Sequence, residues 1–497
     1  MTRKKTVIIT GGGMSGIVSA LRLSRAGFAV VLIEKNKTLG GKVSQIKGNG
    51  YTFELIPSFI EYIEVYEELF KYLGLDIKKY LNFKRLESAY KFNFSDGTYI
   101  NAYRDKNKLS AEFNKFEKNS YKKINRFFKE NKEKSAFIKN NILGNNSNPS
   151  ITSKLNLTLK YFQLSILQKY WKNIDKYFTS EKVKLILSFY NAYFSIDPYK
   201  DASLFTVIPY EELSKGIYSI KGGMSSVIDS FEIILNEMKV KVIKGDEVSR
   251  LKFNNRNITS VKLKSGKEIK GDVFLSDINR IDFNKRFLSK KIPSSYINKL
   301  EKSNLSNSVI TIYLGLNKKF KNLEYHNFYI NNNLQSIVND LKKIHNEEWI
   351  PSFYFVNPSK NDDTIAPKGY TALSILISVP NLKYRNNWEK IFPEIKDSIY
   401  RIMEEDLNMK NFKNSIKFEK IMYPKDWINK LSLYKGSILG LIPDYWNPIN
   451  LVSQKKSKYL SNLYFSSVGD IYSRPGVSWE ILNAKIVSEK IISNCKV

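Results

Sequence analysis

Cysteine and histidine are scarce in this 497-residue chain, which contains one cysteine, Cys495, and two histidines. A single cysteine cannot form an internal disulfide, so we expect a protein of a reducing compartment, the cytoplasm. Zinc sites need a set of several Cys or His ligands, and we therefore expect no metal centre. The sequence also offers no recognisable acid–base triad.

Long apolar runs are absent as well. No stretch of about 18 apolar residues occurs, so we expect no membrane-spanning helix. The formal net charge of +32 favours anionic partners. The basic residues are mostly lysines scattered along the chain, without the patterns of nucleic-acid-binding modules. We therefore expect no nucleic-acid partner and favour peripheral attachment to an anionic membrane surface. The amphipathic segment Leu155 to Tyr177 fits that role, although such a stripe is also typical of a core-facing helix.

What the sequence does contain is a glycine-rich turn between two apolar runs, in the segment VIITGGGMSGIVSALRLSRAGFAVVLIE. Gly11, Gly13 and Gly16 have the spacing G-x-G-x-x-G, a helical pattern follows, and the second apolar run ends at Glu34. This order predicts a β-α-β unit with a dinucleotide site. The phosphates bind the free N–H groups at the start of the helix, and Glu34 is placed to bind a ribose hydroxyl. A carboxylate at that point disfavours a 2′-phosphate and hence NADP.

Further motifs follow in the order of the chain. The pair Gly40-Gly41 precedes Lys42, and an alternating segment reaches Pro57-Ser58. Near the C-terminus a buried strand leads into Val468-Gly469-Asp470, a loop and a helix. With these motifs the sequence resembles the phytoene desaturase-type flavoproteins and, within them, the bacterial diapophytoene (dehydrosqualene) desaturases. The resemblance extends over essentially the whole chain.

The resemblance implies a noncovalently bound FAD on an α/β fold of the two-dinucleotide-binding type, with a mixed-sheet α+β substrate domain and a helical cap. It assigns residues 1–80, 215–290 and 455–497 to the FAD domain, residues 81–108 and 297–450 to the substrate domain, and residues 109–214 to the cap. The cofactor-binding residues that we expect are Gly11, Gly13, Met14, Ser15, Gly16, Glu34, Lys35, Gly41, Lys42, Pro57, Ser58, Val248, Gly469, Asp470 and Val477.

The sequence departs from the family in two regions. Lys42 replaces the usual arginine after the glycine pair, and Ile56 replaces a glycine before Pro57. The C-terminal loop keeps Gly476 and Val477 but loses the glycine and proline around them. In this loop the bulky or charged residues Arg474, Trp479 and Glu480 stand near the expected flavin. We interpret Glu480 as a member of a structural ion pair rather than as a general base.

The family removes hydride from an allylic carbon of a long isoprenoid such as phytoene or diapophytoene, and oxygen or a quinone reoxidises the flavin. The resemblance therefore implies an FAD-dependent oxidoreductase acting on CH–CH bonds in carotenoid biosynthesis. Alternatives are a carotenoid isomerase or saturase, an amine oxidase-like flavoenzyme, and a flavin-binding lipid protein without turnover. We nominate no catalytic residue, and we interpret His326 as structural.

Overall fold

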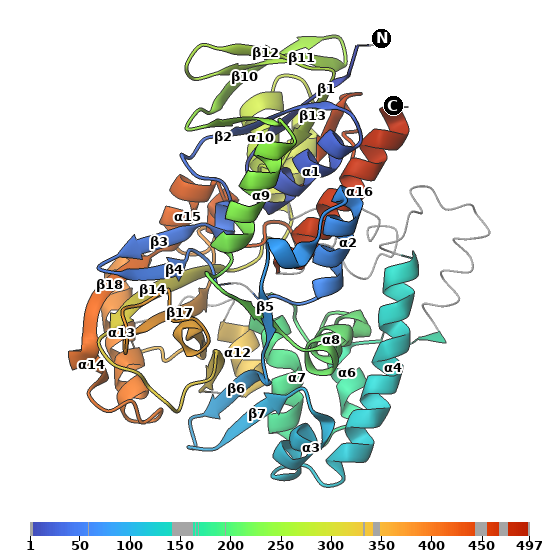
Figure 1. Ribbon diagram of the computed structural model, residues 1–497. Coiled ribbons are helices and arrows are strands. Elements are labelled where there is room, and N and C mark those ends of the chain that lie inside the picture. The colour runs from blue at the N-terminus through green and yellow to red at the C-terminus, as the bar shows by residue number, and fades with distance from the viewer. Residues whose placement is uncertain are drawn as a thin grey trace.

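Two large sheets, three smaller ones and a group of helices make up the described part of the protein (Figure 1). In the view of Figure 1 a parallel sheet with helices α1, α9 and α16 lies above, an antiparallel-rich sheet lies at the lower left, and helices α3, α4, α6, α7 and α8 lie at the lower right. The computed structural model describes residues 3–57, 59–141, 163–164, 166, 168–193, 195–331, 333–340, 348–442, 455–466 and 476–495.

The parallel sheet has five strands in the order β19-β13-β1-β2-β9, and all of its pairings are parallel. The predicted β-α-β unit is confirmed as β1 (Thr6–Thr10), α1 (Met14–Arg25) and β2 (Ala29–Glu34). Strands β13 (Val273–Ser276) and β19 (Leu463–Phe465) bring distant parts of the chain beside β1. Because the strands are parallel, their carboxyl ends meet at one edge, which is where ligands bind in open α/β sheets.

The segment from Val240 to Ile278 contributes strands to two sheets. Strands β10 (Val248–Asn254), β11 (Asn257–Leu263) and β12 (Glu268–Lys270) form an antiparallel sheet. Strand β9 (Lys241–Lys244) instead pairs in parallel with β2. The reason is topological, since a helical crossover returns the chain in the parallel direction, and α9 (Ser225–Glu237) supplies that crossover.

The larger sheet has seven strands in the order β18-β14-β17-β16-β15-β6-β7. Its central strands, β14 and β17, are buried along their whole length and pack against helix α13. Strand β15 pairs in parallel with β6, so the early hairpin joins the later segment in one mixed sheet. The bounds are β6 (Ser88–Phe94), β7 (Tyr99–Tyr103), β14 (Ser308–Leu316), β15 (His326–Ile330), β16 (Phe353–Val356), β17 (Thr371–Val379), β18 (Ile416–Met422) and α13 (Trp388–Glu404).

The helical prediction for residues 109–194 is confirmed where the structure describes them. Helices α3 (Lys106–Asn114), α4 (Ser120–Asn141), α6 (Tyr170–Asp175), α7 (Glu181–Tyr193) and α8 (Val207–Lys215) share an aromatic-rich core with β6 and β15. Most of the expected amphipathic segment from Leu155 onward lies outside the described residues. In its described part, the Tyr170 and Ile174 side chains are fully buried, so there the apolar stripe faces the core.

Short elements connect the sheets and helices. The remaining strands are β3 (Gln45–Gly48), β4 (Tyr51–Glu54), β5 (Phe83–Arg85) and β8 (Tyr218–Ile220), and the remaining α-helices are α2 (Ile63–Leu73), α10 (Arg280–Leu288), α11 (Ser294–Lys302), α12 (Leu334–Asp340), α14 (Phe412–Ser415), α15 (Pro424–Leu431) and α16 (Val477–Cys495). Helices α16 and α9 both pack against α1 in the core of the parallel sheet. Of the helices that the structure describes, none is long and apolar enough to cross a bilayer.

Candidate cofactor site

The glycine loop connects β1 to α1 at the carboxyl edge of the parallel sheet. Gly11 has φ +101° and donates its N–H to the Ile33 carbonyl at 2.8 Å, which holds the turn against β2. Gly13 is the N-cap of α1 and has no side chain of its own to cap the first turn. The helix therefore begins with N–H groups and a positive dipole end directed at the loop, which is the arrangement that binds phosphate.

Steric contacts explain why the loop needs glycine at the second and third motif positions, Gly13 and Gly16. A Cβ on Gly16 would lie 2.1 Å from the Gly11 carbonyl oxygen, and a Cβ on Gly13 would lie 2.6 Å from Asp277 Oδ2. The second glycine pair approaches the same loop, because Gly40 donates its N–H to the Gly12 carbonyl at 2.8 Å. Backbone therefore surrounds the start of α1 on two sides, as a dinucleotide cradle requires.

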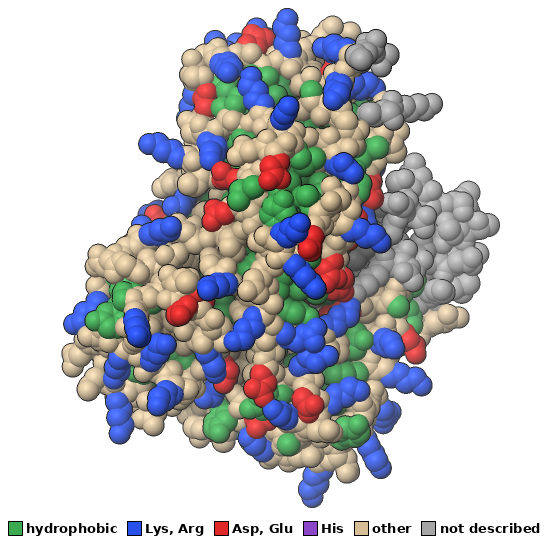
Figure 2. Space-filling model, in the orientation of Figure 1, with side chains coloured by type: hydrophobic (Ala, Val, Ile, Leu, Met, Phe, Trp, Pro, Cys, Tyr) green, Lys and Arg blue, Asp and Glu red, His purple; other side chains and the backbone are tan. Residues whose placement is uncertain are grey.

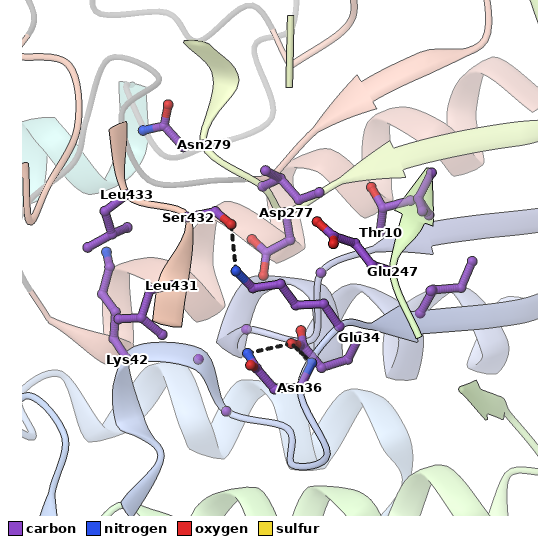
Figure 3. A pocket seen from close by; sticks show the side chains of 18 of the residues that line it. Thr10, Glu34, Asn36, Lys42, Glu247, Asp277, Asn279, Leu431, Ser432 and Leu433 are labelled. Atoms are coloured by element: carbon purple, nitrogen blue, oxygen red, sulfur yellow. Dashed lines mark hydrogen bonds between the residues drawn. The ribbon is translucent and has the colours of Figure 1, made fainter. Parts of the chain in front are cut away.

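Glu34 lies at the end of β2 and is 6% exposed. Its carboxylate accepts hydrogen bonds from the Gly12 N–H at 2.7 Å and from the Asn36 backbone and side-chain N–H groups at 2.8 Å each. Figure 3 shows Glu34 and Asn36 beside the pocket. These bonds fix the carboxylate beside the glycine loop, where a ribose hydroxyl of a dinucleotide can donate to it.

A pocket of about 980 Å³, including its mouth, covers this edge of the sheet. Seven of the expected cofactor residues line it, namely Gly11, Gly13, Glu34, Lys35, Gly41, Lys42 and Val248. Met14, Ser15, Gly16, Pro57 and Val477 are not among the lining residues. Ser58, Gly469 and Asp470 lie outside the described residues, as does Arg474. The complete lining is Thr10, Gly11, Gly13, Ile33 to Asn36, Gly40 to Lys42, Asp246 to Val248, Asp277 to Asn279, Arg286, Leu431 to Leu433, Ile438 to Gly440 and Glu480.

One wall of the pocket was not predicted from the sequence. The segment from Leu431 to Gly440 follows α15 and lies over the pocket opposite the glycine loop. Lys35 Nζ donates a hydrogen bond of 2.7 Å to Ser432 Oγ, and it lies 3.3 Å from the Asn429 carbonyl oxygen. No motif marks this segment, and nearly 400 residues separate the partners, so the sequence carries no local signal of the contact.

Asp277 is a second residue that the sequence did not indicate. Its Oδ2 accepts the Gly16 N–H at 3.0 Å, and its Oδ1 accepts the Ser466 hydroxyl at 3.2 Å. Burial, reinforced by the negative charge of Glu480, raises the pKa of the Asp277 carboxyl to about 8. Figure 3 shows this side chain in the pocket together with Glu34 and Glu247. A carboxyl group thus lies at the helix start where phosphates bind.

The ion pair expected for Glu480 is present. Lys42 Nζ lies 3.8 Å from Glu480 Oε1. Ser15 Oγ donates to the Glu480 carbonyl oxygen at 2.9 Å, which ties the first turn of α16 to that of α1. The Trp479 side chain is 6% exposed, and its ring meets the Tyr62 ring edge-on at 5.7 Å.

The first turn of α16 also contacts the segment that follows Pro57. Ser478 Oγ donates to the Glu61 carbonyl oxygen. Two residues earlier, the Phe59 ring lies 4.4 Å from the His326 ring and 5.3 Å from the Tyr354 ring. Burial lowers the pKa of His326 to about 3. The imidazole is therefore neutral at ordinary pH, which fits the structural interpretation of His326.

These observations agree with a bound dinucleotide. The glycine cradle and the helix start suit the diphosphate, and Glu34 suits a ribose. Fold and site together define a dinucleotide-binding protein of the α/β class.

Comparison with known proteins makes this assignment specific. Residues 14–361 match the flavin containing amine oxidoreductase family. The chain belongs to this family, and it is an FAD-dependent oxidoreductase.

Three curated relatives align over nearly the whole chain. A 4,4'-diapolycopene oxygenase from Methylomonas sp is 25% identical and covers 98% of both chains. A zeta-carotene-forming phytoene desaturase from Myxococcus xanthus is 23% identical over 99% of this chain and 95% of its own. A 4,4'-diapophytoene desaturase from Methylomonas sp is 25% identical over 99% and 96%. The resemblance to phytoene desaturase-type proteins is thereby confirmed.

A solved structure confirms the fold class. An oxidoreductase from Methanosarcina mazei superposes with a TM-score of 0.64 at 14% identity and covers 97% of this chain and 100% of its own. At that identity the likeness concerns the fold alone.

Proposed function

We propose that this protein desaturates a long apolar isoprenoid, a carotenoid precursor such as phytoene or diapophytoene. The observation that carries the proposal is the aromatic cluster around Phe59, defined as Phe59, Tyr90, Phe92, Phe328 and Tyr354 with His326. The segment with Phe59 also contacts the first turn of α16, next to the expected flavin end of the cofactor. The names of the relatives support the same substrate class.

The cofactor is assigned to the pocket and its continuation toward α16. The N–H groups that start α1 and the loop glycines hold the diphosphate, Glu34 and Lys35 bind the adenosine ribose side, and the backbone at Val248 contacts the adenine. Gly469, Asp470 and Val477 are assigned to the flavin end, together with Pro57 and Ser58. When bound, FAD accepts a hydride from a substrate carbon while a proton leaves the neighbouring carbon, which gives a new double bond.

The chain's own contribution is the aromatic cluster around Phe59, an apolar and water-excluding core whose side chains are at most 3% exposed, and the substrate is assigned to its edge. Aromatic side chains bind a polyene through buried apolar area and complementary shape rather than through hydrogen bonds. His326 is neutral, and its Nδ1 is hydrogen-bonded to the Tyr354 hydroxyl at 2.7 Å, so it adds no charge to the cluster. An uncharged aromatic cluster suits a hydrocarbon.

A long apolar isoprenoid dissolves in the lipid bilayer and not in water. We therefore assign the protein to the cytoplasmic membrane surface. Lys and Arg side chains are spread over the whole visible face in Figure 2. Tyr99 is 47% exposed, with Lys91 Nζ and Lys115 Nζ at 4.8 and 5.1 Å from its ring. An exposed aromatic ring flanked by lysines fits the headgroup layer of an anionic membrane, where the lysines contact the lipid phosphates. Oxygen or a quinone in that membrane is the proposed electron acceptor.

An anaerobic titration tests the reaction. The purified holoenzyme is mixed with phytoene or diapophytoene in liposomes, and the visible spectrum is followed. We expect bleaching of the oxidised flavin band together with the appearance of a polyene spectrum. A flavin band that stays oxidised with every isoprenoid would reject the desaturase.

The names of the relatives also include an oxygenase, and the same experiment separates this activity. The reaction is repeated under ¹⁸O₂ with a diapocarotenoid as substrate, and the mass of the product is measured by mass spectrometry. Desaturation gives loss of two hydrogens without label, whereas oxygenation gives an ¹⁸O-labelled product. A product of unchanged mass would indicate an isomerase.

A further inference from the structure

Two partly buried carboxyl groups, those of Asp277 and Glu480, lie where the phosphates of the cofactor are expected. Asp277 Oδ2 accepts the Gly16 N–H at 3.0 Å, and a Cβ on Gly13 would lie 2.6 Å from the same oxygen. Glu480 approaches from α16 and forms an ion pair of 3.8 Å with Lys42. Both acids line the same pocket as Gly11 and Gly13.

The electrostatic balance at this point opposes an anionic ligand. The diphosphate of FAD carries two negative charges at neutral pH, and Lys42, which lies 3.8 Å from Glu480, is the cation whose charge lowers the pKa of Asp277. If both carboxyl groups were ionised, the buried site would hold two negative charges against one positive charge before FAD arrived. Like charges at short range in a buried site raise the energy steeply.

We propose that Asp277 is a proton-dependent component of the FAD site, which admits the diphosphate of FAD while it carries a proton and repels the diphosphate when it is ionised. The inference rests on FAD binding and not on the substrate proposed above. As an acid, Asp277 retains its contacts to the Gly16 N–H and Ser466, and adds no charge. Burial and the Glu480 charge raise its pKa to about 8, so the protonated form predominates at neutral pH.

Proton linkage gives the direction of the effect. The bound diphosphate favours the protonated carboxyl, so FAD affinity is constant below about pH 8 and falls above it. The dissociation constant should rise by about tenfold per pH unit once Asp277 is ionised in the free protein.

Other groups around the pocket also titrate and must be separated from Asp277. Glu480 faces Asp277 from α16, and Lys42 faces it from the turn after β2. Farther along the pocket, burial lowers the pKa of Lys35, so loss of its positive charge also weakens FAD binding at alkaline pH. Glu34, Asp246, Glu247 and Arg286 complete the charged lining.

The test measures FAD affinity directly. Holoenzyme is equilibrated at pH values from 6 to 10, free FAD is collected by ultrafiltration, and its absorbance gives the dissociation constant. Far-UV circular dichroism at each pH shows that the protein stays folded. The variant Asp277→Asn keeps size and hydrogen bonding without the charge. Asp272→Asn is the matched control, because Asp272 precedes the same strand and its carboxylate accepts the Thr6 N–H at 2.7 Å outside the pocket.

We expect the wild type and Asp272→Asn to lose affinity above about pH 8, and Asp277→Asn to bind FAD at least about tenfold more tightly than the wild type at pH 9.5. If Asp277→Asn does not fold, Glu480→Gln decides. Removing the Glu480 charge lowers the pKa of Asp277, so the loss of affinity should begin at a lower pH. The proposal is overturned if the FAD dissociation constant of the wild type stays level from pH 7 to 9.5. It is equally overturned if the dissociation constant of Asp277→Asn rises with pH as steeply as that of the wild type. An FAD dissociation constant of Glu480→Gln that begins to rise at the same pH as in the wild type would overturn it as well.

Discussion

Lys35 Nζ and Ser432 Oγ are joined by a hydrogen bond of 2.7 Å that connects the end of β2 to the turn after α15. The bond links the parallel sheet to the region of the larger sheet, across the mouth of the cofactor pocket. Asn36 Nδ2 reaches the Lys430 carbonyl oxygen at 3.3 Å and strengthens the same connection. The FAD pocket is therefore closed by residues that belong to two different parts of the fold.

Breaking the hydrogen bond between Lys35 and Ser432 should lower the affinity of the protein for FAD. Lys35→Met keeps most of the apolar stem of the side chain but removes the donor, and a bond of this kind contributes about 1 kcal/mol. We expect FAD to bind about fivefold more weakly, as measured by ultrafiltration of the holoenzyme at pH 7. Lys37→Met is the control, because Lys37 is exposed two residues along and lies outside the pocket lining. Equal effects of the two variants would show that net charge, and not the connection, retains FAD. Ser432→Ala removes the acceptor and leaves the Lys35 charge in place, so a normal affinity in Ser432→Ala would assign the effect of Lys35→Met to a direct contact with FAD.

Gly13→Ala should abolish FAD binding without unfolding the protein. Gly13 has φ −73°, so alanine introduces no backbone strain there. The new methyl group would instead lie 2.6 Å from Asp277 Oδ2 and fill the cradle. We expect purified Gly13→Ala to lack the flavin absorbance band while keeping its circular dichroism spectrum.

Gly266, a glycine with positive φ outside the pocket, provides the comparison for Gly13. Gly266 has φ +92°, and a Cβ there would meet nothing within 4 Å. Gly266→Ala should lower the free energy of unfolding by about 1 kcal/mol and retain full FAD. A flavin-loaded Gly13→Ala protein would contradict the phosphate cradle.

Local rules were sufficient for the first half of the site and not for the second. The strand, the glycine spacing, the helix and Glu34 lie within 28 consecutive residues, and each follows from the conformational needs of that short segment. Asp277 and Ser432 reach the pocket only because β13 pairs with β1 and because α15 ends beside Lys35. Strand order and long-range packing decide such contacts, and no local pattern encodes them.

Acid should destabilise the helical region through Glu117. This carboxylate is 3% exposed and accepts the N–H groups of Thr179 and Ser180 at 2.8 and 2.7 Å. Burial alone would raise its pKa, but Lys123 and these hydrogen bonds outweigh burial and lower the pKa below 4.5. A lowered folded-state pKa gives stability that is complete above the unfolded value of about 4.5 and is lost as the pH falls through the folded value.

The variant Glu117→Gln should remove this contribution. We expect the free energy of unfolding at pH 7 to fall by about 1–3 kcal/mol, and the difference from the wild type to shrink as the pH approaches 3. Urea unfolding at several pH values measures both quantities. Glu133→Gln, an exposed position on α4, should be neutral throughout. A difference that grows toward low pH would contradict the sign derived from the lowered pKa.

Phe59 offers the sharpest test of where the substrate binds. Its ring contacts His326 and Tyr354, and its segment reaches the first turn of α16. Phe59→Leu removes aromatic area from the proposed substrate surface, and we expect the rate of anaerobic flavin bleaching by a carotenoid precursor to fall by about tenfold, with FAD content unchanged. Phe392→Leu is the matched control, because Phe392 is fully buried in the core beneath the larger sheet and loses the same aromatic area. Stopped-flow absorbance measures both rates, and thermal unfolding checks that the two variants lose similar stability. A slow Phe59→Leu beside a normal Phe392→Leu would place the substrate at the aromatic cluster, whereas equal rates would move the substrate away from Phe59.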